Sequence, residues 1–144
     1  MVKYSQTKYE RTFKEAVPKS FASLITGYGF SLTQTENWKF ELTSQQCVLE
    51  IYLDRTDVLV FAKPVRIEQV PKPRVGIPMS FNIKEVINYL YPDVGFEYKR
   101  ISTPEDIQPE SDRLVELLRQ YCTSILQGDF SIWPKLLERR RRSI

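Results

Sequence analysis

Hydrophobic and polar positions change their period along the chain. Over residues 7–27 the apolar side chains fall mostly three and four positions apart, the spacing that places them on one face of a helix. Pro18 lies inside this stretch and removes a backbone donor, so the pattern predicts a kinked helix or two short helices. Gly27 and Gly29 then predict the end of the helical segment.

From Phe30 to Val65 the period becomes two, which is typical of half-buried strands. The apolar positions are Trp38, Phe40 and Leu42 in one run and Cys47, Leu49, Ile51 and Leu53 in the next. The stretch DRTD, residues 54–57, leads into a third run, VLVFAKPV. Short polar connections between alternating runs predict an antiparallel meander.

A proline-rich extended connection is expected over residues 64–78, followed by a helix in the stretch SFNIKEVINYL. Asn82 is the expected N-cap of that helix, and Glu85 at the third helical position would close a capping box. A short strand is expected over residues 95–101.

The last third of the chain is predicted to be helical. Apolar residues recur at i, i+3, i+4 and i+7 from Pro109 to Gly128, which predicts one long amphipathic helix. A last helix is expected after Ser131, with Pro134 in its first turn, where the missing N–H costs little.

These elements predict the α+β class. We expect a single α+β domain over residues 1–144, an antiparallel β-meander with an N-terminal helix and C-terminal helices packed on one face. The other face of the sheet should be partly exposed. A length of 144 residues and a hydrophobic content of 42% suit one folded domain with its own core.

The charge of the chain is concentrated at one end. Glu138 and Arg139–Arg142 carry the whole formal net charge of +3, so the rest of the chain has equal numbers of acidic and basic residues. Four arginines at a helix end suggest nucleic acid, but cations also interact favourably with the C-terminal end of a helix dipole. Because the body is neutral, we favour the structural interpretation of Arg139, Arg140, Arg141 and Arg142.

Catalytic chemistry is poorly represented. The chain has no histidine, which excludes histidine general bases, Ser-His and Cys-His nucleophiles and most zinc sites. Carboxylates remain as candidates for acid–base or magnesium chemistry; they are Glu50, Asp54, Asp57 and Asp129. Polar turn residues explain these positions more simply, so the sequence predicts no enzyme, no cofactor and no metal.

Aromatic residues gather on or beside the predicted sheet, where exposed rings could stack bases. They are Tyr28, Phe30, Trp38, Phe40, Tyr52 and Phe61. Basic residues do not alternate with them, which favours packing in the core and at the sheet edge.

Cys47 and Cys122 lie in apolar-periodic stretches without metal-ligand spacing and are expected to be free core residues. The N-terminal stretch has no apolar segment typical of a signal peptide, and no apolar run is long enough to span a membrane. We therefore expect a cytoplasmic protein.

The order of the elements resembles small bacterial α+β proteins, among them immunity proteins of polymorphic toxin systems. The stretch ILQGDFSIW, residues 125–133, carries the most specific part of this resemblance. The resemblance implies binding and occlusion of a toxin, without a catalytic motif. Inhibitors of nuclease toxins are often strongly acidic, whereas this body is neutral, which argues against a nuclease partner.

The sequence thus predicts a non-enzymatic module that binds a partner protein. The alternative is a nucleic-acid-associated accessory protein that uses Arg139–Arg142, and a carboxylate-dependent enzyme ranks third.

Overall fold

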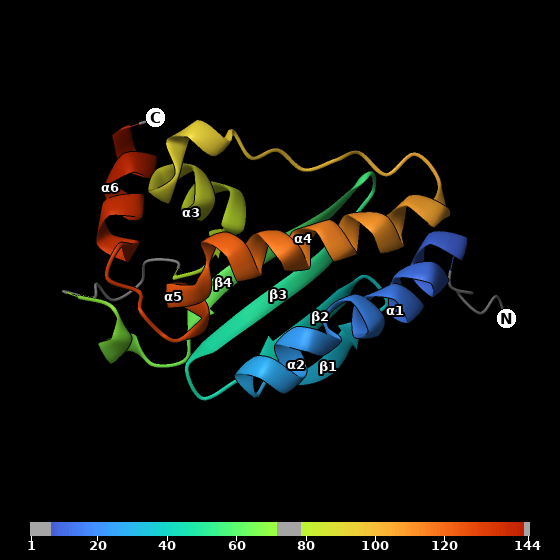
Figure 1. Ribbon diagram of the computed structural model, residues 1–144, viewed down its shortest axis with the longest axis horizontal. Coiled ribbons are helices and arrows are strands. Elements are labelled where there is room, and N and C mark those ends of the chain that lie inside the picture. Colours follow the sequence, from blue (N-terminus) through green and yellow to red (C-terminus); the bar gives the residue numbers. More distant parts are fainter. Residues whose placement is uncertain (1–6, 72–78, 143–144) are drawn as a thin grey trace, which may run out of the picture.

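The protein is built around one sheet of five antiparallel strands in the order β1-β2-β3-β4-β5 (Figure 1). The computed structural model describes residues 7–71 and 79–142. The strands are β1 (Ser31–Glu36), β2 (Lys39–Thr43), β3 (Cys47–Asp54), β4 (Asp57–Pro64) and β5 (Phe81–Asn82). The α-helices are α1 (Lys8–Ser20), α2 (Ala22–Tyr28), α3 (Ile83–Leu90), α4 (Ile107–Tyr121), α5 (Thr123–Leu126) and α6 (Trp133–Arg142). The predicted α+β class and antiparallel meander are confirmed.

Helices cover one face of the sheet, and the hydrophobic core lies between the two layers. Figure 1 shows α1, α2 and α4 in front of the strands. The rings of Phe13 in α1 and Phe40 in β2 meet edge to face at 5.3 Å, and Leu118 of α4 is fully buried. Period-two alternation on β2, β3 and β4 supplies the sheet side of this core, and the i, i+4 stripes of α1 and α4 supply the other side.

The N-terminal helical segment divides as the sequence predicts. Helix α1 contains Pro18 and ends at Ser20, with Phe21 as its C-cap, and α2 begins at Ala22. Gly29, with a φ of 72°, ends α2 in the left-handed conformation that glycine adopts without steric cost. The chain then enters β1 and the meander.

The segment between α3 and α4 corrects one prediction. Residues 95–101 form no strand. Instead, the Tyr98 hydroxyl accepts a hydrogen bond from the Val60 N–H at 3.2 Å and donates to Asn82 Oδ1 at 2.6 Å. A part-buried side-chain hydroxyl thus bonds the backbone of β4, where a short strand was expected. Phe81–Asn82 forms a short fifth strand that the sequence did not predict.

The expected cap of α3 is confirmed in part. Asn82 is the N-cap, but its Oδ1 accepts from the Lys84 N–H at 2.8 Å and not from the third helical residue. The expected capping box is wrong, because the Glu85 carboxylate bonds Arg140 of α6 instead. A long-range charged partner therefore replaces the local backbone contact.

The C-terminal helical region consists of three helices. The expected single helix from Pro109 to Gly128 is interrupted at Cys122, which ends α4 before the short α5 begins. Helix α6 brings the buried Trp133 against Phe81 at 5.4 Å, and the Trp133 indole N–H donates to the Met79 carbonyl at 2.6 Å. This packing fixes α6 beside α3 and the β5 end of the sheet.

Two further expectations concern the cysteines and the connection before α3. Cys47 and Cys122 are buried free cysteines, as predicted. Burial raises the pKa of each thiol to about 12. Of the connection expected over residues 64–78, the second half lies outside the described residues, and the first half contains the 3-10 turn η1 (Ile67–Gln69).

Candidate functional site on the outer face of the sheet

The face of the sheet opposite α1 and α4, called the outer face below, carries polar and aromatic side chains from three strands. Strand alternation requires directly paired residues to share a face. The pairs on the outer face are Lys39 with Tyr52, Glu41 with Glu50, Glu50 with Phe61, and Tyr52 with Leu59. This face therefore has a mixed polar and apolar character that the core-facing side lacks.

Three aromatic rings form a continuous row on the outer face. Trp38 stacks on Tyr52 with ring centres 6.0 Å apart and an interplanar angle of 20°. Tyr52 in turn meets Phe61 edge to face at 5.5 Å. Trp38 is 45% exposed, whereas Tyr52 and Phe61 are half-buried. The row thus has one broad ring open to solvent and two that support it.

The position of Trp38 departs from its sequence pattern. The alternation of Trp38 with Phe40 and Leu42 placed all three on the core side, and Phe40 and Leu42 are indeed buried. Trp38, however, belongs to the turn between β1 and β2, and its carbonyl accepts from the Leu53 N–H at 2.9 Å. A turn residue does not follow strand alternation, so its ring can lie over Tyr52 on the outer face.

An open groove of about 670 Å³ runs along this aromatic row. Its walls are Trp38, Glu50, Tyr52, Leu53, Asp54, Leu59, Phe61, Ser80 and Arg140. These residues come from the β1–β2 turn, β3, β4, the segment before β5, and α6. The groove therefore joins side chains from distant parts of the sequence on one surface.

Glu50 lies at the floor of the groove and is surrounded by donors. Its Oε2 is 3.1 Å from Lys39 Nζ and 3.9 Å from Lys63 Nζ. The Tyr52 hydroxyl donates to the same oxygen at 3.1 Å, and the Ser80 hydroxyl donates to Oε1 at 3.1 Å. The carboxylate is thus held by four side chains from β2, β3, β4 and the segment before β5.

The surroundings of Glu50 determine its ionisation. Burial by itself would raise the pKa of the Glu50 carboxyl. The hydrogen bond from Lys39 and the charge of Lys63 outweigh it, with a further contribution from Ser80, so that the pKa is lowered. Glu50 is therefore a stable anion at neutral pH.

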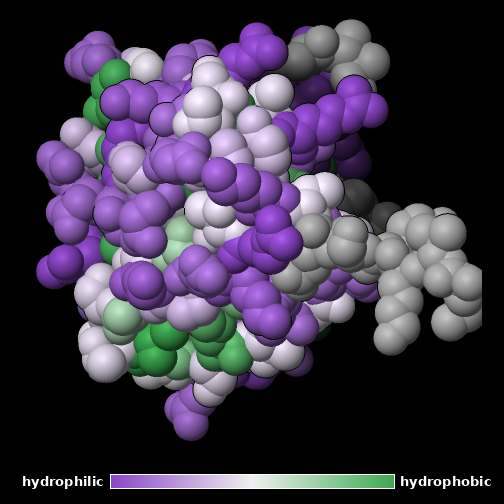
Figure 2. All heavy atoms as spheres, turned by 90° about the vertical axis from the view of Figure 1, so that its right-hand side faces the viewer, coloured by the Kyte–Doolittle hydropathy of each residue, from purple (hydrophilic) through white to green (hydrophobic). Residues whose placement is uncertain are grey.

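The turn between β3 and β4 adds negative charge at one end of the groove. Asp54 lines the groove, and Asp57 is paired directly opposite it across the strands, on the other side of Arg55 and Thr56. Arg55 has a φ of 49°, in the left-handed region that non-glycine residues seldom adopt. Neither aspartate forms an ion pair with any described residue. Figure 2 views the molecule from the side toward which this turn points, and most of that surface is hydrophilic.

The arginine run lies at the other end of the molecule, on α6. The Arg140 guanidinium makes two hydrogen bonds to the Glu85 carboxylate, at 2.9 and 3.1 Å, and lies 4.3 Å from the centre of the Phe81 ring. Arg142 pairs with Glu138 at 2.6 Å, and the Arg139 guanidinium lies 6.0 Å from the Tyr89 ring centre. Arg141 is exposed at the end of the helix.

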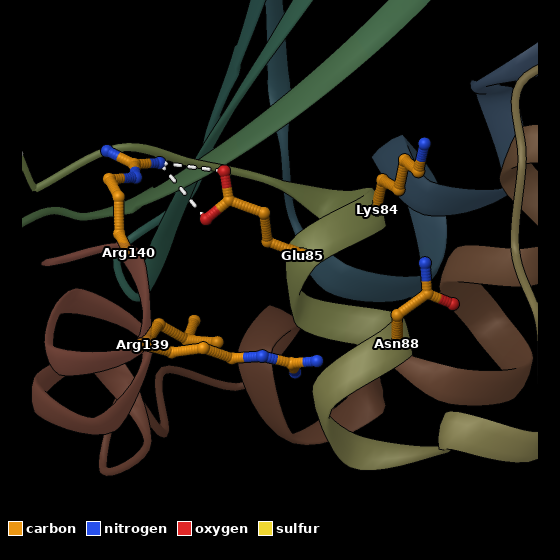
Figure 3. Close-up of a pocket in the computed structure, with 6 residues that line it drawn as sticks. Lys84, Glu85, Asn88, Arg139 and Arg140 are labelled. Carbon is orange, nitrogen blue, oxygen red and sulfur yellow. Dashed lines mark hydrogen bonds and ion pairs between the residues drawn. The ribbon is translucent and has the colours of Figure 1, made fainter. Parts of the chain in front are cut away.

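A second, smaller groove of about 370 Å³ separates α3 from α6 (Figure 3). Figure 3 shows the side chains of Arg140 and Glu85 meeting across it, while Arg139 extends toward α3 near Asn88. Lys84 is paired with Glu97 at 2.7 Å. Lys84 and Arg140, which line this groove, thus already have a carboxylate partner on the protein.

The remaining candidate carboxylate, Asp129, is held by hydrogen bonds from a neighbouring residue. Asp129 accepts from the Ser131 N–H at 3.0 Å, and hydrogen bonds from the Ser131 side chain and backbone lower the pKa of its carboxyl. Among residues 7–71 and 79–142, no cluster of three or more metal-binding side chains is present. Within the same ranges, no helix is long and apolar enough to cross a membrane.

Only part of this site could be predicted from the residue pattern. Interpreting the aromatic residues as core and edge packing is correct for Phe30 and Phe40, which are buried, but not for Trp38. The Glu50 network could have been found from the sequence, because strand alternation places Lys39 and Lys63 on the same face of the sheet as Glu50. The contribution of Arg140, 90 residues away, had no local signal.

Comparisons with known protein families, with curated proteins and with solved structures found no match to this chain.

Proposed function

We propose that this protein is a non-enzymatic module that binds a partner protein through the outer face of its sheet and occludes it, as immunity proteins occlude toxins. The observation that carries the proposal is the row of Trp38, Tyr52 and Phe61 along an open groove on the face that α1 and α4 leave uncovered. A large exposed ring supported by two others is a pre-ordered contact, which loses little entropy on binding.

The composition of the outer face suits a protein partner. Tryptophan, tyrosine and arginine dominate the energetics of protein interfaces, usually at the centre of a patch with a polar rim. Trp38, Tyr52 and Arg140 line the groove, and Asp54 lines it at the β3–β4 turn, with Asp57 paired directly opposite Asp54. A groove of about 670 Å³ has room for one or two side chains of a partner.

The state of Glu50 supports a binding role over a catalytic one. A carboxylate whose pKa is lowered and whose oxygens accept from several donors is a weak proton donor and a weak base at neutral pH. The network instead holds β2, β3 and β4 together beneath the aromatic row.

The alternative function is nucleic-acid binding, in which bases would stack on Trp38 or phosphates would bind to the arginine run. Two observations favour protein. Glu50 and Asp54 line the groove, so phosphates would meet negative charge there. On α6, Arg140 and Arg142 are already paired with Glu85 and Glu138.

The test uses purified products of neighbouring reading frames as candidate partners, with binding measured by calorimetry. We expect Trp38→Ala to raise the Kd at least about tenfold, because truncating an interface anchor commonly costs 2 kcal/mol or more. The matched control is Tyr91→Ala, which removes an aromatic residue that is also 45% exposed but lies after α3, away from the outer face. Both variants should keep the wild-type circular dichroism spectrum.

A functional readout separates occlusion from simple binding. If the partner inhibits growth when expressed alone, co-expression of this protein should restore growth, and Trp38→Ala should restore it less than Tyr91→Ala does. Equal affinity of Trp38→Ala and wild type, with loss of binding in Tyr91→Ala, would place the interface elsewhere and refute the proposal.

A further inference from the structure

We propose that the turn end of the outer-face groove accepts the guanidinium group of an arginine on the partner, between the Trp38 ring and the carboxylates of Asp54 and Asp57. This inference rests on the proposed function and adds the chemistry of the residue that the groove recognises. These three residues are called the acidic corner below.

Two like charges face each other at this corner. Asp54 and Asp57 are directly opposite across the β3–β4 pair, an arrangement that destabilises a sheet unless a cation compensates it. Lys39 and Lys63 on the outer face are engaged by Glu50, and Arg55 lies in the turn between the two aspartates. Among the described residues no lysine or arginine forms an ion pair with either aspartate, so a compensating cation has a place to bind.

The ring of Trp38 supplies the second part of the site. Tryptophan is the best aromatic partner for a cation, and the chain places cations against several of its other rings. Arg140 lies 4.3 Å from the Phe81 ring centre, and Arg113 lies 5.5 Å from that of Phe96. Trp38 stacks on Tyr52, is 45% exposed, and has no cation near its ring among the described residues.

Other occupants fit the acidic corner less well. An apolar side chain would remove water from the two carboxylates without replacing its hydrogen bonds, which is costly. An anion would be repelled by both aspartates. A guanidinium stacks on an aromatic face and donates to carboxylates in the same plane, whereas the ammonium of lysine is a strongly hydrated point charge. Arginine therefore satisfies all three groups together.

The direct test needs no partner. Nitrogen–proton correlation spectra of the full chain are recorded while N-acetyl-arginine methylamide is added, with N-acetyl-citrulline methylamide as the neutral control of the same shape. We expect the arginine probe to shift the Trp38 indole signal and the backbone amides of residues 52–57, and the citrulline probe to leave them unchanged. The buried Trp133 indole, bonded to Met79, serves as an internal reference.

Variants assign the effect to the carboxylates. Asp54→Asn with Asp57→Asn keeps oxygen acceptors in the turn but removes both charges, so the fold should persist and the probe shifts should be lost. Glu41→Gln, on the same face but away from the groove lining, should leave the shifts unchanged. No shift with arginine, or equal shifts with both probes, would overturn the inference.

Once a partner protein has been identified, binding experiments can test the arginine inference and the proposed function independently. We expect the double asparagine variant to weaken partner binding about tenfold, and the loss to become smaller at high salt. If Trp38→Ala abolishes binding but the double variant binds as wild type does, the outer face is the interface and the arginine inference is wrong. If neither variant changes the affinity, the proposed interface fails as well.

Discussion

Glu50 shows how one residue can organise the surface of a sheet. It exposes 7% of its area, yet it contacts two lysines and two hydroxyl groups that come from different strands and from the segment before β5. A buried charge of this kind is stabilising only while its partners remain, because removing one leaves the others without compensation.

Glu50→Gln should lower the free energy of unfolding by about 1.5–3 kcal/mol at pH 7, the usual range for hydrogen bonds to a charged group. Because the pKa of Glu50 is lowered in the folded protein, its contribution is present above the ordinary glutamate pKa and is lost as pH falls through the folded value. The difference between wild type and Glu50→Gln should therefore shrink below about pH 4. Urea unfolding at several pH values measures it.

Glu41 is the matched control for this prediction. It lies directly opposite Glu50 on β2 and forms no ion pair with any described residue. Since like charges opposite each other are unfavourable, Glu41→Gln should leave stability unchanged or raise it slightly. A Glu50→Gln variant as stable as Glu41→Gln at neutral pH would show that the network contributes nothing.

At the scale of single residues, the sequence predicted burial better than it predicted contacts. Alternation placed Phe40 and Leu42 in the core because a strand has only two faces. The same rule failed for Trp38, since the turn after β1 extends through Trp38 and β2 begins only at Lys39. Contacts such as Arg140 with Glu85 depend on how α6 meets α3, which no local pattern encodes.

Among the secondary-structure elements, α3 illustrates how a cap can serve two purposes. Asn82 Oδ1 accepts from the backbone N–H of Lys84 and from the Tyr98 hydroxyl, which also accepts from Val60 of β4. Burial raises the pKa of Tyr98, the largest effect on that group, so the hydroxyl stays protonated and remains a donor. One amide oxygen therefore starts the helix and fixes the segment after it.

Asn82→Ala should destabilise the protein by about 1–3 kcal/mol, because it removes the cap and the short hydrogen bond from the Tyr98 hydroxyl, which is left to donate to the Val60 carbonyl at 3.2 Å. Asn82→Asp, which retains an oxygen acceptor at the N-terminus of the helix, should recover part of this loss. The measurement is the urea midpoint of both variants. A wild-type midpoint for Asn82→Ala would mean that neither hydrogen bond contributes to stability.

Elements with strong periodicity were predictable, and those defined by tertiary contacts were not. The meander over β2, β3 and β4 follows from alternation and short turns. The strand expected over residues 95–101 is wrong, because this segment packs as irregular chain with the Tyr98 side chain, not its backbone, bonded to β4. Strand β5 has only two residues and leaves no periodic signal.

For the whole molecule, the two ends of the outer-face groove differ in charge. Asp54 lies at the β3–β4 turn, and Arg140 reaches the groove from α6, the last helix described. The same Arg140 side chain pairs with Glu85 in the groove between α3 and α6. The C-terminal helix is thus part of the packed structure, which bears on the role of the arginine run.

Truncation after Glu138 tests that role. We expect the shortened protein to remain folded and its free energy of unfolding to fall by only about 0.5–2 kcal/mol. Truncation removes the Arg140–Glu85 ion pair and the contact of Arg140 with Phe81, and the Arg140 and Glu85 side chains are each more than one-third exposed, so solvent weakens both contacts. Arg140→Ala should reproduce most of this loss, and Arg141→Ala, which alters the exposed end of the helix, should not. Thermal and urea unfolding provide the comparison.

The same variants decide between the structural and the nucleic-acid interpretations of the run. Four arginines that neutralise duplex phosphates would give a log–log salt slope of at most about −3.6, so binding should be absent near 150 mM salt and weak near 50 mM. The pairing of Arg140 with Glu85 and of Arg142 with Glu138 should make it weaker still. A tight, salt-resistant complex with duplex DNA or RNA that disappears on truncation would instead establish the alternative, with the arginine run as its binding site.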